Sequence, residues 1–250
     1  MTLRLEVIGG IARLLIDRPL KRNAMTTAMF AQLPALIAEA EAKKHVRAIL
    51  LTSARAGMFC AGADIAELSA HAADDAWRAD NQQAINTAQH RLARADRPVV
   101  AFIDGDCIGG GCGMALACDI RVATSRSRFG ITPAKLGLVY PLHDTKLLVD
   151  LVGPGQAKRI LFTGALLDAE EALRIGLVDL IADTPDEVLH AIAAASPHSH
   201  ANTKAMIRRI LDGQSEDDDT TRAMFADAFI GDDFREGVTA FLGKRGADFR

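Results

Sequence analysis

A run of glycines directly after an apolar segment is the feature that most restricts how this chain can fold. The segment PVVAFID, residues 98–104, is typical of a buried strand, and the run GGGCG follows it at residues 109–113. The run leads into MALACD and then into a second strand-like segment, DIRVAT. Strand, glycine turn, helix and strand in this order are typical of parallel βαβ units. The sequence therefore predicts an α/β fold with a parallel sheet.

The first hundred residues contain further elements of such a fold. The segments LRLEV and IARLLID flank Gly9 and Gly10, which predicts a β-hairpin with a two-glycine turn. Apolar side chains at helical spacing predict helices over residues 26–44 and 75–95. Between these two helices, residues 46–53 have the pattern of a buried strand.

The second half of the chain changes its pattern near residue 185. Asp168 is placed to cap a helix over EEALRI, Gly176 to end that helix, and LVDLIA to form a last short strand. Beyond this strand the pattern is helical throughout. We therefore expect an α/β core over residues 1–185 and a helical C-terminal region over residues 186–250. Its amphipathic helices must cover either this core or a neighbouring subunit.

Composition excludes several classes of protein. The chain has 250 residues, 49% of them hydrophobic and 24% charged, which suits one compact domain rather than a disordered or fibrous chain. Its 29 Lys and Arg residues face 32 Asp and Glu residues, so no overall basic field favours nucleic acid. No uninterrupted apolar run is long enough for a membrane span, and the start lacks the pattern of a signal peptide. We expect a cytoplasmic protein that has no membrane partner.

The cysteines and histidines give no sign of a disulfide or a metal site. No CxxC pair, HExxH motif or Cys/His zinc pattern occurs. We expect buried free thiols and no metal. The four cysteines concerned are Cys60, Cys107, Cys112 and Cys118.

Two small-residue loops are the first candidates for chemistry: MFCAGADI at residues 58–65, and Gly109 to Gly111. Where a helix begins at glycines, its first NH groups lack an internal partner and can donate to an anionic oxygen. A pair of such groups would form an oxyanion hole, whereas a tight turn or close helix packing is the structural alternative for the glycine run. The GxGxxG dinucleotide motif, the GK[ST] ending of a phosphate loop and the GxSxG nucleophile elbow are all absent.

The two loops occur together, in this order, within a longer set of segments. In that respect the chain resembles the crotonase (enoyl-CoA hydratase/isomerase) superfamily. The resembling segments are RPLKRNAM, FCAGADIAEL, GDCIGGGCGMALACDIRVAT, FGITPAKLGLVYP, VGPGQAKRILFTGALLDAEEALRIGLVD and FREGVTAFLGKRGADF, which cover nearly the whole chain.

The resemblance implies a ClpP/crotonase spiral of ββα units with a helical C-terminal trimerisation region. It also implies an acyl-CoA thioester substrate, as in fatty acid metabolism, no cofactor beyond the coenzyme A of that thioester, and a homotrimer or a dimer of trimers. We expect nucleic acid to be an unfavoured partner.

The resemblance also assigns residues. It implies that the NH groups of Ala63 and Gly110 form the oxyanion hole for the thioester carbonyl, and that the backbone around Ala61 and Ile65 faces the adenine. Four cations are candidates for the CoA phosphates, the last two from a neighbouring subunit, with simple surface solvation as the alternative: Lys21, Arg22, Lys244 and Arg245.

The chain departs from the family where hydratases carry two glutamates. Alignment of the motifs puts Gly113 and Pro133 at those positions, and neither residue can transfer a proton. Each such acid or base is worth ~10²- to 10⁴-fold in rate. The sequence therefore argues against standard hydration, and also against isomerisation by the usual carboxylate.

An oxyanion hole without those glutamates could still support enolate chemistry, because each preorganised donor contributes roughly 3 kcal/mol. Decarboxylation is one such reaction, and TPAKLGLVY is similar to methylmalonyl-CoA decarboxylase, whose site tyrosine matches Tyr140. That enzyme has a histidine where this chain has Ala63. Tyr140 is therefore either a site residue or a packed loop tyrosine.

His143 and Asp144 stand where many relatives carry two glycines. Asp144 is a candidate proton acceptor, but we favour its role as the cap of a helix over TKLLVDLV. Asp64 and Asp119 are expected to be structural. Two classes of function remain. The first is a lyase or isomerase that acts on acyl-CoA, including decarboxylase-like or hydrolase chemistry through Tyr140 and Asp144. The second is a non-catalytic CoA-thioester binder. RNA binding through KAMIRRIL is a weaker third.

Overall fold

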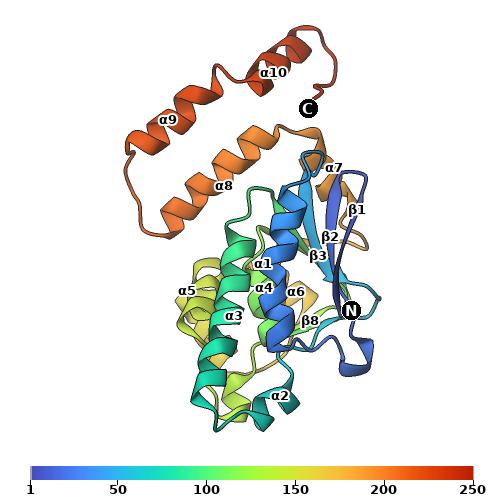
Figure 1. The fold of residues 1–250 in the computed structure, drawn as a ribbon, viewed down its shortest axis with the longest axis vertical. Coiled ribbons are helices and arrows are strands. Elements are labelled where there is room, and N and C mark those ends of the chain that lie inside the picture. Colours follow the sequence, from blue (N-terminus) through green and yellow to red (C-terminus); the bar gives the residue numbers. More distant parts are fainter. Residues whose placement is uncertain (1, 250) are drawn as a thin grey trace.

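The computed structural model describes residues 2–249, which form two β-sheets with helices packed around them (Figure 1). The larger sheet has six strands in the order β1-β2-β3-β5-β7-β10, and only β1 and β2 are antiparallel. These strands are β1 (Leu3–Ile8), β2 (Ile11–Ile16), β3 (Ala48–Ser53), β5 (Val99–Ile103), β7 (Ile120–Ala123) and β10 (Leu180–Ile181).

The smaller sheet has four short strands in the order β4-β6-β8-β9, of which β4, β6 and β8 are parallel. They are β4 (Met58–Cys60), β6 (Asp106–Ile108), β8 (Arg128–Gly130) and β9 (Leu167–Asp168). Along the chain, β3 is followed by β4, β5 by β6 and β7 by β8, and helices follow each pair. Each turn of the chain thus adds one strand to each sheet and then a helix, which is the expected spiral of ββα units.

The predicted hairpin at the start of the chain is confirmed. Ile8 pairs with Ile11, and the two residues between them, Gly9 and Gly10, have φ values of 57° and 78°. Positive φ at both central positions is what a type I′ turn requires, and glycine reaches it without steric cost.

Helices α1 (Thr27–Glu41) and α3 (Asp75–Ala93) cover one face of the larger sheet (Figure 1). Helix α1 begins where Thr26 accepts a hydrogen bond from the Met29 amide, and it ends three residues before the predicted end. It continues through Pro34, whose missing hydrogen bond is offset by a buried face on both sides of it. That face consists of Met29, Phe30, Leu33, Ile37 and Ala40.

The remaining helices of the core follow the sheet strands. Asp168 caps α6 by accepting from the Glu171 amide, and Gly176, at φ 80°, follows its end, as predicted. Helix α7 packs on the outer face of the larger sheet, where Leu189 is buried with Leu50 and Val100. These helices are α2 (Ile65–Ala70), α4 (Gly110–Leu116), α5 (Leu142–Thr163), α6 (Ala169–Arg174) and α7 (Asp186–Ala194).

Helices α8 (Pro197–Leu211), α9 (Asp219–Ala228) and α10 (Asp232–Leu242) extend from one end of the molecule (Figure 1). Lys204 of α8 anchors the first of them by an ion pair of 2.7 Å to Asp119 in the core. Helices α9 and α10 leave large apolar side chains exposed, among them Phe225, Phe241 and Leu242. None of the helices between residues 2 and 249 has the length and apolar character of a membrane span.

Candidate active site

The two small-residue loops of the sequence meet in the structure. Residues 61–64 follow β4 and Gly109 follows β6, and these two strands are parallel neighbours, so both loops leave the same edge of the smaller sheet. Gly62 has a φ of 98°, and a Cβ on it would lie 2.9 Å from the Ile108 oxygen and 3.3 Å from the Gly110 nitrogen. Only glycine permits this approach of the two loops.

The backbone amides of Ala63 and Gly110 are neighbours, and both lack a partner. A Cβ on Gly110 would lie 3.5 Å from the Ala63 nitrogen. On either side of Ala63, the Gly62 carbonyl accepts from the Met25 amide and the Asp64 amide donates to Met25. Within residues 2–249, neither the Ala63 nor the Gly110 amide has an acceptor, and Gly110 is the first residue of α4. Two free NH groups therefore lie side by side at a helix N-terminus.

Asp64 fixes the first loop and has the structural role expected from the sequence. Its carboxylate accepts from the amides of Ala66 and Glu67 at the start of α2 and forms an ion pair of 2.7 Å with Arg18. The hydrogen bond from Arg18 lowers the pKa of this carboxyl below its usual value. Asp64 is thus held as a carboxylate that caps α2, not as a proton carrier.

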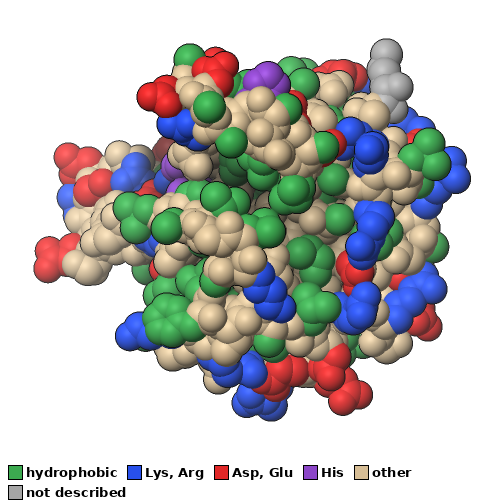
Figure 2. Space-filling view, turned by 90° about the horizontal axis from the view of Figure 1, so that it is seen from below, with side chains coloured by type: hydrophobic (Ala, Val, Ile, Leu, Met, Phe, Trp, Pro, Cys, Tyr) green, Lys and Arg blue, Asp and Glu red, His purple; other side chains and the backbone are tan. Residues whose placement is uncertain are grey.

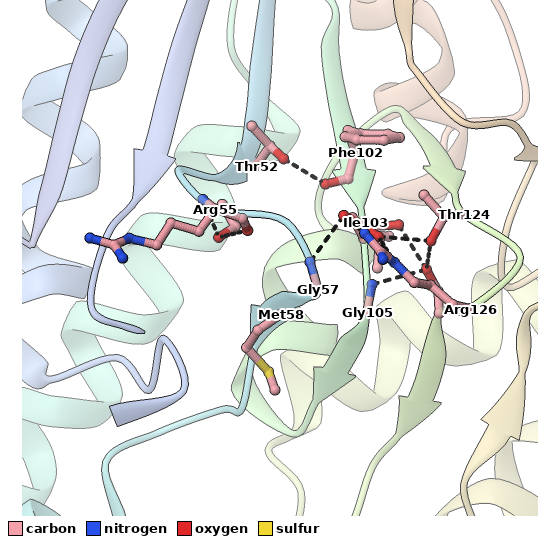
Figure 3. Close-up of polar contacts among 12 residues, drawn as sticks. Thr52, Arg55, Gly57, Met58, Phe102, Ile103, Gly105, Thr124 and Arg126 are labelled. Atoms are coloured by element: carbon pink, nitrogen blue, oxygen red, sulfur yellow. Dashed lines mark hydrogen bonds and ion pairs between the residues drawn. The ribbon is translucent and has the colours of Figure 1, made fainter. Parts of the chain in front are cut away.

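A second carboxylate, Asp104, fixes the chain where β5 turns into β6, and Figure 3 labels its partners Gly57, Thr124 and Arg126. It accepts from the Gly57 amide at 3.0 Å and from the Thr124 hydroxyl at 3.0 Å, and it forms a bidentate pair with Arg126. Gly105 packs against Gly57 so closely that a Cβ would overlap the Gly57 backbone. These contacts hold the two loop-bearing strands in register.

A cluster of side chains occupies the space beside Gly113, one turn further along α4. A Cβ on Gly113 would overlap Asp144 Oδ1, would lie 2.5 Å from Gln89 Nε2 and would be 3.3 Å from the Tyr140 hydroxyl. Gln89 comes from α3, Tyr140 from the segment before α5, and Asp144 from the first turn of α5. The position that the family resemblance gives to a glutamate is therefore filled by side chains from two other parts of the chain.

Asp144 is not the helix cap that the sequence favoured. Helix α5 begins at Leu142 after Pro141, and Asp144 lies inside the first turn with only 2% of its surface exposed. Pro141 ends the preceding segment in extended backbone, which moves the helix start upstream of Asp144. The carboxylate turns inward, where Gln89 Nε2 donates to its Oδ1 at 2.6 Å and Oδ2 has no partner within residues 2–249.

Burial raises the pKa of Asp144, and the hydrogen bond from Gln89 and the nearby Tyr140 hydroxyl oppose this rise. Burial also raises the pKa of Tyr140 well above its usual value, and the neighbouring carboxylate of Asp144 adds to that rise. Tyr140 is therefore a neutral phenol, and its hydroxyl donates to the Gly109 carbonyl at 3.4 Å. It thus links the carboxyl cluster to the loop that carries the free amides.

Pro133, the second position at which the family resemblance expects a glutamate, begins a 3₁₀ helix, η2 (Pro133–Leu136), and brings no ionisable group. The chain after it exposes the apolar side chains of Leu138, Val139 and Leu142.

Helix α2 lies at the lower end of the molecule in Figure 1, opposite α9 and α10. Viewed from below, hydrophobic side chains gather in the middle of the surface and Lys and Arg side chains lie along one side (Figure 2).

The four candidate cations fall into two places. Arg22 lies at the loops, because its carbonyl accepts from the Ala61 amide at 3.0 Å and its guanidinium pairs with Asp106; Lys21 is exposed beside it. Lys244 and Arg245 follow α10 at the opposite end of the chain, and Arg245 pairs with Glu236. One chain therefore does not bring all four cations together.

The structure also places the other residues that the sequence singled out. Ala61 is half-buried and Ile65 is exposed at the first loop. Asp119 is structural, through its pair with Lys204. All four cysteines are buried free thiols, as predicted, and no cluster of metal-ligating side chains occurs among residues 2–249.

An apolar cavity of about 450 Å³ lies away from both loops, between α8 and the core, and is lined by residues such as Leu116, Leu147 and Ile207.

Gln89 is the residue that sequence analysis missed. It is fully buried on α3, on the same face as Ala88 and Leu92. A glutamine within the apolar stripe of an amphipathic helix is the signal that could have identified it, because a buried amide requires a partner.

Comparison with known proteins extends the resemblance to the whole chain. The family model for enoyl-CoA hydratase/isomerase matches residues 6–250. The short-chain-enoyl-CoA hydratase of Clostridium acetobutylicum is 34% identical over 96% of this chain and 94% of its own length. The crotonyl-CoA hydratase of Syntrophomonas wolfei is 33% identical over 98% of this chain and 96% of its own.

A solved structure agrees with the fold. It is that of a protein from Hyphomonas neptunium assigned to the enoyl-CoA hydratase/isomerase family, with a TM-score of 0.96 and 39% sequence identity, covering 100% of this chain and 98% of the other. Together with the spiral of ββα units and the paired loops, these matches show that the chain belongs to the enoyl-CoA hydratase/isomerase family of the crotonase superfamily.

Proposed function

We propose that this protein is a cytoplasmic acyl-CoA enzyme that stabilises a thioester enolate and moves a proton through Asp144. The observation that carries the proposal is the arrangement on α4. Gly110 bears a free amide next to that of Ala63, and Gly113, three residues later on the same helix face, contacts the buried carboxyl of Asp144. An oxyanion site and a proton carrier thus lie one helical turn apart.

In this proposal the thioester oxygen binds between the amides of Ala63 and Gly110. These donors stabilise the negative charge of the enolate, and each contributes roughly 3 kcal/mol to the transition state. Because the amides belong to folded backbone at a helix N-terminus, they need no reorganisation when the charge forms.

Asp144 takes the role that a glutamate at residue 113 would have, from a different segment of the chain. Burial of its carboxyl raises the pKa, which makes it a better general acid or base near neutral pH than an exposed aspartate. Pro133 supplies no second carboxyl, so the reaction we propose is not standard hydration with two glutamates but a single-carboxyl proton transfer at the α-carbon. Isomerisation and the protonation step after decarboxylation both meet this description, with Tyr140 as the neutral donor beside the carboxyl.

The acyl-CoA would lie across the lower face of the molecule. The backbone around Ala61 and Ile65 would contact the adenine, and Lys21 and Arg22 the phosphates. Lys244 and Arg245 can contribute only from a neighbouring subunit, and the exposed apolar side chains of α9 and α10 provide a surface for such a subunit. We therefore propose a homotrimer or a dimer of trimers, with no cofactor beyond the coenzyme A of the substrate.

A panel of thioesters tests this function. Enoyl-, hydroxyacyl- and malonyl-CoA compounds are assayed for binding by calorimetry and for conversion by product analysis. We expect binding across the panel and conversion of at least one member without formation of a hydration product. Binding without conversion of any member would instead support the second candidate, a non-catalytic CoA-thioester binder. Release of free CoA would indicate hydrolase chemistry.

A further inference from the structure

Gln89 is a fully buried amide on a helix face that is otherwise apolar. Its neighbours on α3, Ala88, Leu92 and Ala93, are buried as well. An apolar side chain of the same size would pack there without the cost of burying an amide. Packing alone therefore does not explain a glutamine at this position.

The polar atoms of Gln89 meet Asp144 and nothing else in the described chain. Nε2 donates to Asp144 Oδ1 at 2.6 Å, whereas Gln89 Oε1 and Asp144 Oδ2 are both buried and both lack a partner within residues 2–249. Oδ1, which lies beside Gly113, is thus fixed by Gln89, and Oδ2 is buried with its hydrogen-bonding capacity unused within residues 2–249.

We propose that Gln89 is a positioning residue: by donating to Oδ1 it orients the Asp144 carboxyl and leaves Oδ2 as the oxygen that exchanges a proton with the acyl group. The proposal rests on the proposed function. In the forward step the substrate Cα–H bond breaks, an O–H bond forms at Oδ2, and the electron pair enters the enolate held by the two amides. In the reverse step Oδ2 returns the proton to the carbon.

Gln89 is the hydrogen-bond partner that most strongly lowers the pKa of Asp144. Burial raises the pKa of Asp144, and among the groups that oppose this rise the hydrogen bond from Gln89 is the strongest, followed by Tyr140. Burial also raises the pKa of the Cys107 thiol, which is near enough to Tyr140 to add to the rise in the pKa of that residue. No cation contacts the carboxyl among the residues that the structure describes.

Two histidines lie next to the cluster and complete its titratable surroundings. His143, which precedes Asp144, stacks on His90 of α3 with ring centroids 4.3 Å apart. Burial lowers the pKa of both rings. Arg94 and Arg208 lower the pKa of His90 further while Asp212 opposes them, and His90 and nearby cations lower the pKa of His143 further. Both shifts favour the neutral form of the two rings.

The test replaces the amide with a side chain that cannot donate and with one that donates only when it is protonated. In Gln89→Leu and in Gln89→Glu, the titration of Asp144 is followed by the infrared carbonyl band that is lost in Asp144→Asn. In the Leu variant, loss of a hydrogen bond to the carboxylate should move the midpoint upward by about one pH unit. In the Glu variant the two adjacent carboxyls should share a proton and titrate in two steps, and the upper midpoint should lie higher still. Gln83→Leu, on the exposed face of the same helix, is the control and should leave the midpoint unchanged.

Turnover provides the second readout. With an active thioester from the panel, Gln89→Leu should move the acidic limb of the pH profile upward by the same amount and lower kcat about tenfold with KM nearly constant. If the midpoint and the pH profile stay in place in both variants, Gln89 only packs and the proposal is wrong. A shifted midpoint without turnover of any thioester would retain the Gln89–Asp144 coupling and reject the proposed function. If Gln89→Leu does not fold, the titration midpoint and the pH profile of Gln89→Glu, whose side chain has the same shape as glutamine, decide between these outcomes.

Discussion

The amide pair and the carboxyl cluster lie one helical turn apart on α4, yet the chain assembles them in different ways. The amides of Ala63 and Gly110 belong to backbone, and each sits in a loop that continues directly from a strand of the smaller sheet. The cluster at Gly113 combines side chains from α3 and α5 with a glycine of α4. A backbone site depends on the path of the chain, whereas a side-chain site can be supplied by any segment that reaches it. A chain can therefore keep a backbone site while the side chains next to it change.

The largest effect is expected from removing the proton carrier while leaving the amides in place. Asp144→Asn keeps the shape of the side chain but cannot exchange a proton, so kcat should fall by ~10²- to 10⁴-fold with thioester affinity nearly unchanged. Steady-state kinetics and calorimetry measure the two quantities. Unchanged kcat would show that the cluster is structural and that the amides act with another acid or base.

A substitution that moves the two loops apart should separate the free amides of Ala63 and Gly110. A Cβ in Gly62→Ala would lie 2.9 Å from the Ile108 oxygen at a φ of 98°, so the loops must move apart. Loss of one oxyanion donor should lower kcat about 10²-fold, and backbone strain should lower the free energy of unfolding by about 1–3 kcal/mol.

Gly57→Ala is the matched control for this loop variant. It has a similar φ of 89° but nothing within 4 Å of the new Cβ. It should share the loss of stability in denaturant unfolding and keep most of the activity. Equal losses of activity in both variants would mean that strain, not the amide pair, is responsible.

A smaller effect is expected at the link between the two parts of the site. Tyr140→Phe removes the hydroxyl that donates to the Gly109 carbonyl and contacts the carboxyl cluster. The loss of one such hydrogen bond should lower kcat about tenfold while CoA affinity changes little. An unchanged kcat would assign Tyr140 to packing alone.

The smallest effect concerns stability as a function of pH. Because folding raises the pKa of Asp144, the folded state binds the proton more tightly than the unfolded state, whose carboxyl titrates near 3.8. The contribution of Asp144 to the free energy of unfolding is therefore greatest at low pH and decreases as the pH rises above about 3.8 toward the folded pKa.

Urea unfolding of the native chain and of Asp144→Asn between pH 4 and 8 measures this contribution. The difference in stability between the two should change in favour of the Asn variant as the pH rises. A difference that does not vary with pH would mean that Asp144 is not buried as a titrating group.

Sequence analysis predicted the parts of this molecule that depend on local pattern. The Gly9–Gly10 hairpin, the Asp168 cap and the strands on either side of the glycine run are confirmed because each depends on residues that are neighbours in the chain. The prediction that Asp144 caps a helix was wrong. It was inferred from sequence spacing, whereas the helix begins two residues earlier, at Leu142. Gln89 was missed, because the partner of its amide within residues 2–249, Asp144, is 55 positions away in the sequence.

The amino-acid sequence by itself determined the family, the spiral of ββα units and the two loops whose free amides lie side by side, since glycines and strand patterns act through the local backbone. Only the tertiary structure decided what stands beside Gly113. A missing side chain leaves a space, and the packing of α3 and α5 against α4 determines which distant carboxyl and amide fill it.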